Sequence, residues 1–107
     1  METINKKILH VGCANVIYPQ FINVDGNEYS PRGKKYEKLD ERWRLEEPWP
    51  HKDESIDGIV GMGVFCQLHW RDLVISFREA LRVLKKGGVF RIGTPLVENN
   101  KPLDHLL

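Results

Sequence analysis

Two features near the amino terminus have the residue types that a nucleoside-binding site needs. The first is the turn Gly12-Cys13-Ala14, which ends a short apolar run, and the second is Asp25, which ends another such run and precedes Gly26. Small residues let a ligand come close to the backbone, and an ionised carboxylate accepts hydrogen bonds from both hydroxyls of a ribose. Each feature alone is typical of an ordinary tight turn. Together, one strand apart, they favour a nucleoside ligand.

Four strands and one helix are predicted to position these residues. Apolar runs bounded by glycine, proline or polar residues predict strands at 7–11, 21–25, 56–62 and 89–93. Apolar residues at helical spacing, followed by Gly87-Gly88 as a left-handed stop, predict a helix from about Arg71 to Lys86. The polar stretch 28–52 is predicted to be loop, with at most one short strand or turn near 36–39. The buried face of the helix is expected to comprise Leu73, Val74, Phe77, Ala80, Leu81 and Leu84.

The order of these elements predicts an α/β fold with a mostly parallel sheet. A strand-helix-strand connection implies parallel pairing with a right-handed crossover. In open sheets of this kind, ligands bind beyond the carboxyl ends of the strands, near the switch in strand order. Gly12 and Asp25 both follow such strand ends. Because the 107 residues contain no repeat and no linker, we expect residues 1–107 to form one domain.

Composition and charge argue against several classes of protein. Sixteen basic and fifteen acidic residues leave a net charge of +1, which gives no overall attraction to nucleic acid or to an anionic membrane. No apolar run approaches the roughly 20 residues of a membrane span, and no signal peptide is expected. Cys13 and Cys66 are too few for a disulfide framework, so we expect reduced thiols in a cytoplasmic protein. The histidines lack metal-ligand spacing, and no metal site is predicted.

Three ordered sequence segments carry a resemblance to a known family. They are LHVGCA at 9–14 with PQFINVD at 19–25, PWPHKDESID at 48–57, and RVLKKGG at 82–88. Over about residues 6–95 the chain resembles the class I S-adenosylmethionine-dependent methyltransferases, close to the small methyltransferases of the type 11 group. The resemblance implies a Rossmann-like methyltransferase fold, here truncated at its carboxyl end.

The same resemblance implies a site for S-adenosylmethionine. In the family, the first glycine turn contacts the methionine part of the cofactor, and the acidic residue that ends the second strand holds the ribose; Gly12 and Asp25 match these positions. The segment around Leu45 and Trp49 would lie near the adenine, and residues 61–64 would face the sulfonium. The expected cofactor-binding residues are therefore Gly12, Cys13, Ala14, Asp25, Gly26, Leu45, Trp49, Gly61, Met62 and Gly63. No catalytic residue and no particular methyl acceptor is implied.

Four positions depart from the family pattern and leave two principal functions open. Ala14 stands where a second glycine is usual, Arg44 where an aspartate contacts adenine, and Cys66-Gln67 where many relatives carry Glu-His. The first function is a small methyltransferase that acts on an unidentified acceptor. The alternative is a catalytically inactive methyltransferase-like module that binds or regulates a protein partner. A third, cofactor cleavage without an acceptor, is the least favoured.

The carboxyl-terminal part of the chain predicts a partner. Only twelve residues follow Pro95, whereas typical members of the family continue with two more strands. The strand at 89–93 is therefore expected to be a sheet edge, and an unpaired edge invites pairing with another chain. We expect a homodimer, or a protein partner at this edge; cover by the tail itself is the alternative.

Overall fold

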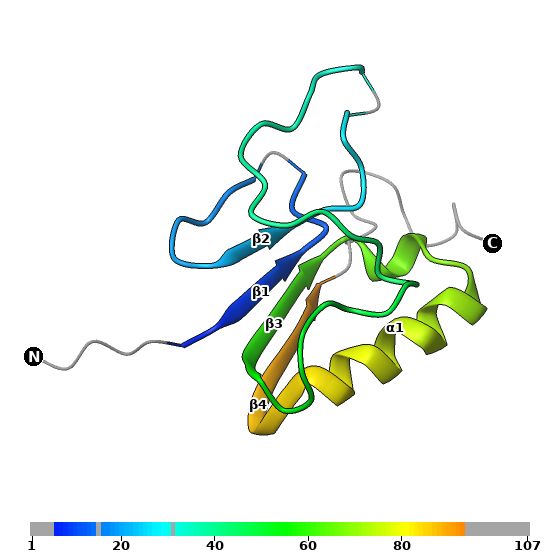
Figure 1. The fold of residues 1–107 in the computed structure, drawn as a ribbon. Coiled ribbons are helices and arrows are strands. Elements are labelled where there is room, and N and C mark those ends of the chain that lie inside the picture. Colours follow the sequence, from blue (N-terminus) through cyan, green and yellow to red (C-terminus); the bar gives the residue numbers. More distant parts are fainter. Residues whose placement is uncertain (1–5, 15, 31, 94–107) are drawn as a thin grey trace, which may run out of the picture.

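The computed structural model describes residues 6–14, 16–30 and 32–93, in which a parallel sheet packs against one α-helix (Figure 1). The elements in chain order are β1 (Ile8–Val11), β2 (Ile22–Val24), β3 (Ile56–Met62), the short 3₁₀ helix η1 (Phe65–Gln67), α1 (Trp70–Val83) and β4 (Leu84–Gly93). The four strands have the order β2-β1-β3-β4, and every neighbouring pair is parallel. The predicted α/β class and parallel sheet are confirmed.

The strand order places the carboxyl end of β1 at the centre of the molecule. The chain passes from β1 to β2 on one side and then returns to β3 on the other side of β1, so that Val11 pairs with both Val24 and Gly61. Such a switch in direction opens a crevice beyond the strand ends. The long segment between β2 and β3 first loops out beyond the same ends and then runs back to the start of β3 (Figure 1).

One face of the sheet and α1 enclose the core. The rings of Phe65, Phe77 and Phe90 lie 5.5 to 5.7 Å apart, and they join η1, α1 and β4. Aromatic pairs at such distances stabilise a core beyond the area that they bury. The buried residues of the core are Leu9, Val11, Val24, Leu45, Trp49, Ile56, Ile59, Phe65, Ala80 and Val83.

The buried face of α1 differs from the one that the sequence predicts. Ser76, Ala80 and Val83 are buried, whereas Leu81 is 67% exposed and Val74 is also exposed. Successive residues turn by about 100° around a helix. Ser76, Ala80 and Val83 therefore share one stripe, and Leu81 falls about a quarter-turn away from it. The prediction that Leu81 and Val74 belong to the core face is wrong.

The end of α1 also lies earlier than predicted. The helix ends at Val83, and Leu84 is already extended, so the helix passes directly into β4. Gly87 and Gly88 do not stop the helix. They lie in an irregularity of β4, where the register with β3 shifts between the pairs at Leu84 and Val89. Gly87 has a φ of +79°, which this irregularity requires and which glycine adopts without strain.

Two further predictions concern the loop at 36–39 and the strand at the end of the sheet. The segment at 36–39 forms no strand; the pairings on either side of it are isolated bridges between Tyr29 and Lys35 and between Val24 and Glu41. Within the described residues β4 is an edge strand, as expected. The tail from Thr94 onward, and what it covers, lies outside the described residues. In the part of the chain that is described, no helix has the length and apolar character needed to cross a membrane.

Candidate functional site

A cavity of about 430 Å³ lies beyond the carboxyl ends of β1, β2 and β3. Its size is within the roughly 300–1,000 Å³ of small-molecule sites. Most of the predicted cofactor-binding residues come together in its wall, from four segments that are distant in the sequence. Those that line it are Gly12, Ala14, Asp25, Gly26, Leu45, Met62 and Gly63.

Three predicted site residues lie behind this wall. Cys13 is buried, and its N–H donates to the carbonyl of Val24 at 3.0 Å, which ties the turn to β2. Trp49 is buried in the core cluster. Gly61 is also buried, and a Cβ atom there would lie 2.5 Å from the ring of Phe65. These residues position the lining instead of forming it.

Asp25 is one of two carboxylates that line the cavity, and two backbone groups fix its orientation. Its Oδ2 accepts from the N–H of Ala14 at 2.8 Å, and its Oδ1 accepts from the N–H of Asn27 at 2.8 Å. The residue is only 8% exposed but lines the cavity. Each carboxylate oxygen has two acceptor sites, so one on each oxygen remains for a ligand. The arrangement can therefore receive two hydroxyl donors.

The turn after β1 has an unusual backbone at two positions. Gly12 has a φ of +66° and Ala14 a φ of +51°. A Cβ at Gly12 would lie 2.5 Å from that of Val64, so only glycine fits between the turn and the residues after β3. The left-handed conformation of Ala14 explains why glycine is usual there, since an alanine carries a small strain in it. The N–H of Ala14, the residue in this strained conformation, is the one that donates to Asp25.

Asn23 connects the segments around the cavity, a role that sequence reasoning missed. It is buried in β2, and its Nδ2 donates to the carbonyls of Tyr18 and Phe21 and to Asp40. Its Oδ1 faces the Nδ1 of His10 at 3.0 Å. Because Asn23 lies two residues before Asp25, this network fixes the end of β2 on which the carboxylate stands. Its partners are spread along the chain, and no spacing in the sequence reveals them.

The wall opposite the turn contains Trp43 and Leu45, which Trp49 supports from behind. The rings of Trp43 and Trp49 lie 4.9 Å apart, and the Nε1 of Trp49 donates to the carbonyl of Leu45 at 2.9 Å. Glu41 accepts from the Nε1 of Trp43 and contacts the Nε2 of His51, each at 2.8 Å. The indole face of Trp43 is thus held in the cavity wall, where it can stack on a flat ring.

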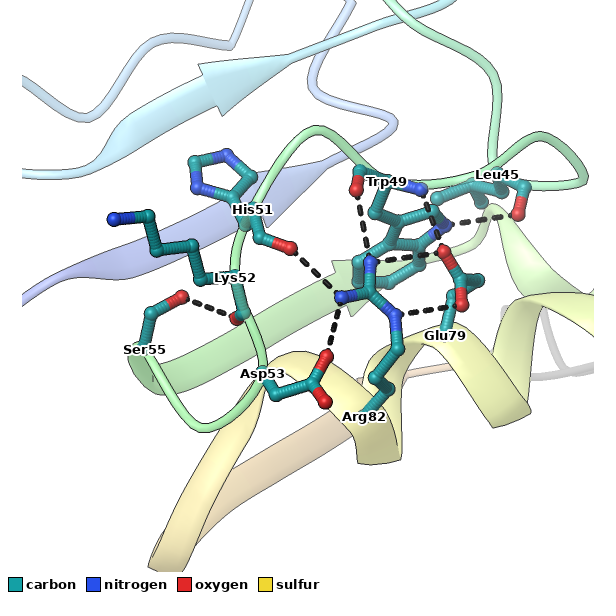
Figure 2. Close-up of polar contacts among 8 residues, drawn as sticks. All are labelled: Leu45, Trp49, His51, Lys52, Asp53, Ser55, Glu79 and Arg82. Atoms are coloured by element: carbon teal, nitrogen blue, oxygen red, sulfur yellow. Dashed lines mark hydrogen bonds and ion pairs between the residues drawn. The ribbon is translucent and has the colours of Figure 1, made fainter.

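Arg82 of α1 fastens this wall to the body of the protein (Figure 2). Its guanidinium donates to the carbonyls of Trp49 and His51, each at 2.9 Å, and pairs with Asp53 and Glu79. Glu79 in turn accepts from the N–H of Trp49 at 2.7 Å. The hydrogen bond from Arg82 is the main reason that the pKa of Glu79 lies below its usual value. The contribution of Glu79 to stability is therefore complete above its ordinary pKa and is lost only as the pH falls through the lowered one.

We expect Arg82→Met to lower the stability by about 2 kcal/mol, because several hydrogen bonds from a charged donor are lost at a side chain that is only 31% exposed. The melting temperature should fall by roughly 10 °C. The same change at Arg78, which is exposed on the same helix, provides the control and should have little effect. Equal melting temperatures for the two variants would show that the Arg82 contacts do not stabilise the wall.

Other lining residues were not predicted as ligands. Arg44, Glu46, Tyr36 and Gln67 bring donors and acceptors to the rim. Burial, with a contribution from the charge of Asp25, raises the pKa of Tyr36 above its ordinary value of 10, so its phenol stays protonated and can donate. Arg44 offers donors only, whereas Glu46 supplies a carboxylate two positions further on. The signal that could have found Glu46 is its place directly after Leu45.

The two cysteines differ in environment. Burial and the nearby charge of Asp25 raise the pKa of the Cys13 thiol to about 11, and Cys66 is exposed on η1. Since the thiolate is the reactive form, we expect a thiol reagent at pH 8 to modify Cys66 at least about 100-fold faster than Cys13 in the native protein. Ellman's assay, with and without denaturant, measures this. Two equal rates in native buffer would contradict the burial of Cys13.

Metal binding has no evident place in the described part of the chain. Across residues 6–14, 16–30 and 32–93, no three His, Cys, Asp or Glu side chains are grouped closely enough to hold an ion.

A parallel sheet with a crossover helix, and a cavity at the strand switch with a carboxylate in its wall, define the Rossmann-like class of α/β domains. Within that class, comparison with protein families matches residues 9–92 to the methyltransferase domain family. The chain belongs to this family, and the resemblance that its sequence segments carry is confirmed. Comparisons with curated proteins and with solved structures give no significant match.

Proposed function

We propose that the protein binds S-adenosylmethionine in the cavity beside Asp25 and transfers its methyl group to an acceptor that is not yet identified. The observation that carries the proposal is the geometry of Asp25, a nearly buried carboxylate that lines the cavity and retains an acceptor site on each oxygen. The diol of a ribose presents two donors to such a group. Membership in the methyltransferase domain family supports this ligand class.

The other lining residues fit the remaining parts of the cofactor. The indole of Trp43 suits a purine ring, and the carboxylate of Glu46 can accept from an amino group. Asp25 and Glu46 bring two negative charges to the lining against the one positive charge of Arg44, a balance that favours a cationic sulfonium. The turn at Gly12 and the residues after β3 close the cavity at the strand ends.

To catalyse methyl transfer, the protein mainly has to position the methyl donor and the acceptor and to exclude water. When bound, the cofactor supplies an activated methyl group for an in-line displacement. The chain's own residues hold the donor at the strand ends and leave the acceptor to approach beside Met62 and Gln67, two lining residues that are exposed. No strong acid or base is required of the protein if the acceptor is already nucleophilic. The absence of a Glu-His pair at Cys66-Gln67 is therefore compatible with activity.

We expect Asp25→Asn to weaken binding of S-adenosylmethionine by about tenfold or more. The amide keeps the shape but lacks the charge and one acceptor oxygen, and a charge-assisted hydrogen bond contributes roughly 1.5–3 kcal/mol. Titration calorimetry on the purified variant measures the affinity, and circular dichroism shows whether the fold is kept. Glu54→Gln is the matched control: it removes the same charge from an exposed site just before β3, at the opposite end of that strand. A folded Asp25→Asn protein with parental affinity would remove Asp25 from the site.

One observation favours the inactive module as the second candidate. After β3, Phe65 is buried in the core, Cys66 points to solvent, and the Nε2 of Gln67 donates to the carbonyl of Gly63 at 2.9 Å. None of the three supplies an acid or a base to the cavity. Cofactor binding without methyl transfer to any of a panel of thiol, amine and hydroxyl acceptors would support the module.

A further inference from the structure

α1 carries an apolar stripe that the core does not cover. Trp70, Val74 and Leu81 are exposed, and with the half-buried Phe77 they repeat along the helix after four, three and four residues. This spacing is the seam of a heptad pattern, along which one helix packs against another. Apolar side chains gathered in this way mark an interaction surface, in contrast to scattered exposed ones.

The stripe lies on the flank of α1 that faces β4. The ring of Phe77 lies 5.7 Å from that of Phe90, whereas Arg82 on the opposite flank holds the segment at 49–53. Side chains of a strand alternate between its faces, so Ile92 shares the face of Phe90, and Ile92 is exposed. Trp70, Val74, Leu81 and Ile92 are called the docking stripe below. Helices in α/β domains lie side by side on a sheet face, so one helix alongside α1 would cover all four.

The charges beside the docking stripe are basic. Two of the exposed side chains of α1 are charged, and both are arginines, Arg71 and Arg78. The other exposed side chains of the helix are apolar: Trp70, Val74, Ile75 and Leu81. The acids of the helix, Asp72 and Glu79, are half-buried. Arg71 and Arg78 are seven residues apart and so lie on one face, at the outer border of the stripe. A helix with acidic side chains along its flanks complements this border.

The same charges disfavour two other occupants. A second copy of the chain would bring the two rows of arginines together, and like charges in contact oppose association. A flat anionic bilayer would meet Arg71 and Arg78 on the outermost face of α1, whereas the stripe lies on the flank toward the sheet. A helix that lies beside α1 reaches the apolar and the basic residues at once.

We propose that the docking stripe binds an amphipathic helix of another protein, with apolar side chains on the stripe and acidic side chains against Arg71 and Arg78. The charges beside the stripe select a different, acidic chain over a second copy. The interaction surface is separate from the cavity, so it holds whether or not the cofactor is bound or turned over.

A pair of synthetic peptides tests the proposal on the full chain. Each has about three heptads with leucine at the a and d positions; one carries glutamate and the other lysine at e and g. Fluorescence anisotropy should show binding of the glutamate peptide and at least about tenfold weaker binding of the lysine peptide. Arg78→Glu leaves Arg71 opposed by one acid and should remove the preference, and Leu81→Glu should remove binding of both. Both positions are exposed, so circular dichroism should show an unchanged fold.

Several results would overturn the proposal. Absence of binding, equal binding of the two peptides, or binding that Leu81→Glu leaves intact would each exclude this surface for an acidic helix. Self-association in sedimentation equilibrium that Leu81→Glu abolishes would assign the stripe to a second copy. Sedimentation with phosphatidylserine vesicles that Leu81→Glu abolishes would assign it to a membrane.

Discussion

Ala80→Asp is expected to unfold the protein, whereas Leu81→Asp, one residue later, should leave it folded. Ala80 is fully buried against the sheet, and Leu81 is 67% exposed. A carboxylate without a partner at the first position costs several kcal/mol, which is comparable to the whole stability of a small domain. At the second position it remains in water. Circular dichroism melting curves of the two variants measure the difference.

The pair also decides which face of α1 forms the core. An unfolded Leu81→Asp protein together with a stable Ala80→Asp protein would mean that the helix is rotated relative to the sheet. The docking stripe would then be part of the core, and its exposure would not support a partner.

Gly12→Ala should lower the stability by about 3 kcal/mol and close the cavity to the cofactor. Two effects add: an alanine at positive φ costs roughly 1–2 kcal/mol, and the new Cβ, only 2.5 Å from that of Val64, overpacks the turn by about 1–3 kcal/mol. Gly33→Ala separates these effects. Gly33 has a φ of +85°, but a Cβ there meets no atom within 4 Å, so this variant carries the backbone strain alone.

Urea unfolding of both variants gives the comparison. A larger loss for Gly12→Ala, accompanied by loss of cofactor binding, is the expected result. If the two glycine variants were equally stable, the close approach of the turn to Val64 would have no energetic role.

The sequence allowed the sheet and its class to be predicted because each strand is a short apolar run between clear breaks. It also located the turn at Gly12 and the carboxylate at Asp25, since both directly follow strands. The face of α1 was harder. Its apolar residues form two adjacent stripes, one on the core and one exposed, and the periodicity merges them, so Leu81 was assigned to the core. Only the tertiary structure separates the two.

The supports of the cavity could not be predicted for a different reason. Asn23 looks like an ordinary strand residue, and Arg82 like one member of a sequence motif, yet each joins segments that are far apart in the chain. Asn23 binds Asp40, and Arg82 reaches Trp49 across the space between α1 and the loop before β3. Such contacts depend on how the loops fold over the sheet, and no local pattern encodes them.

The central claim, that the cavity beside Asp25 is a cofactor site, is tested most directly by titration calorimetry of the purified full chain. The ligands are S-adenosylmethionine and its demethylated product. We expect saturable binding of both to one site, weakened by Asp25→Asn and unchanged by Glu54→Gln. No heat of binding from either ligand at about 1 mM, with a folded protein in the cell, would contradict it.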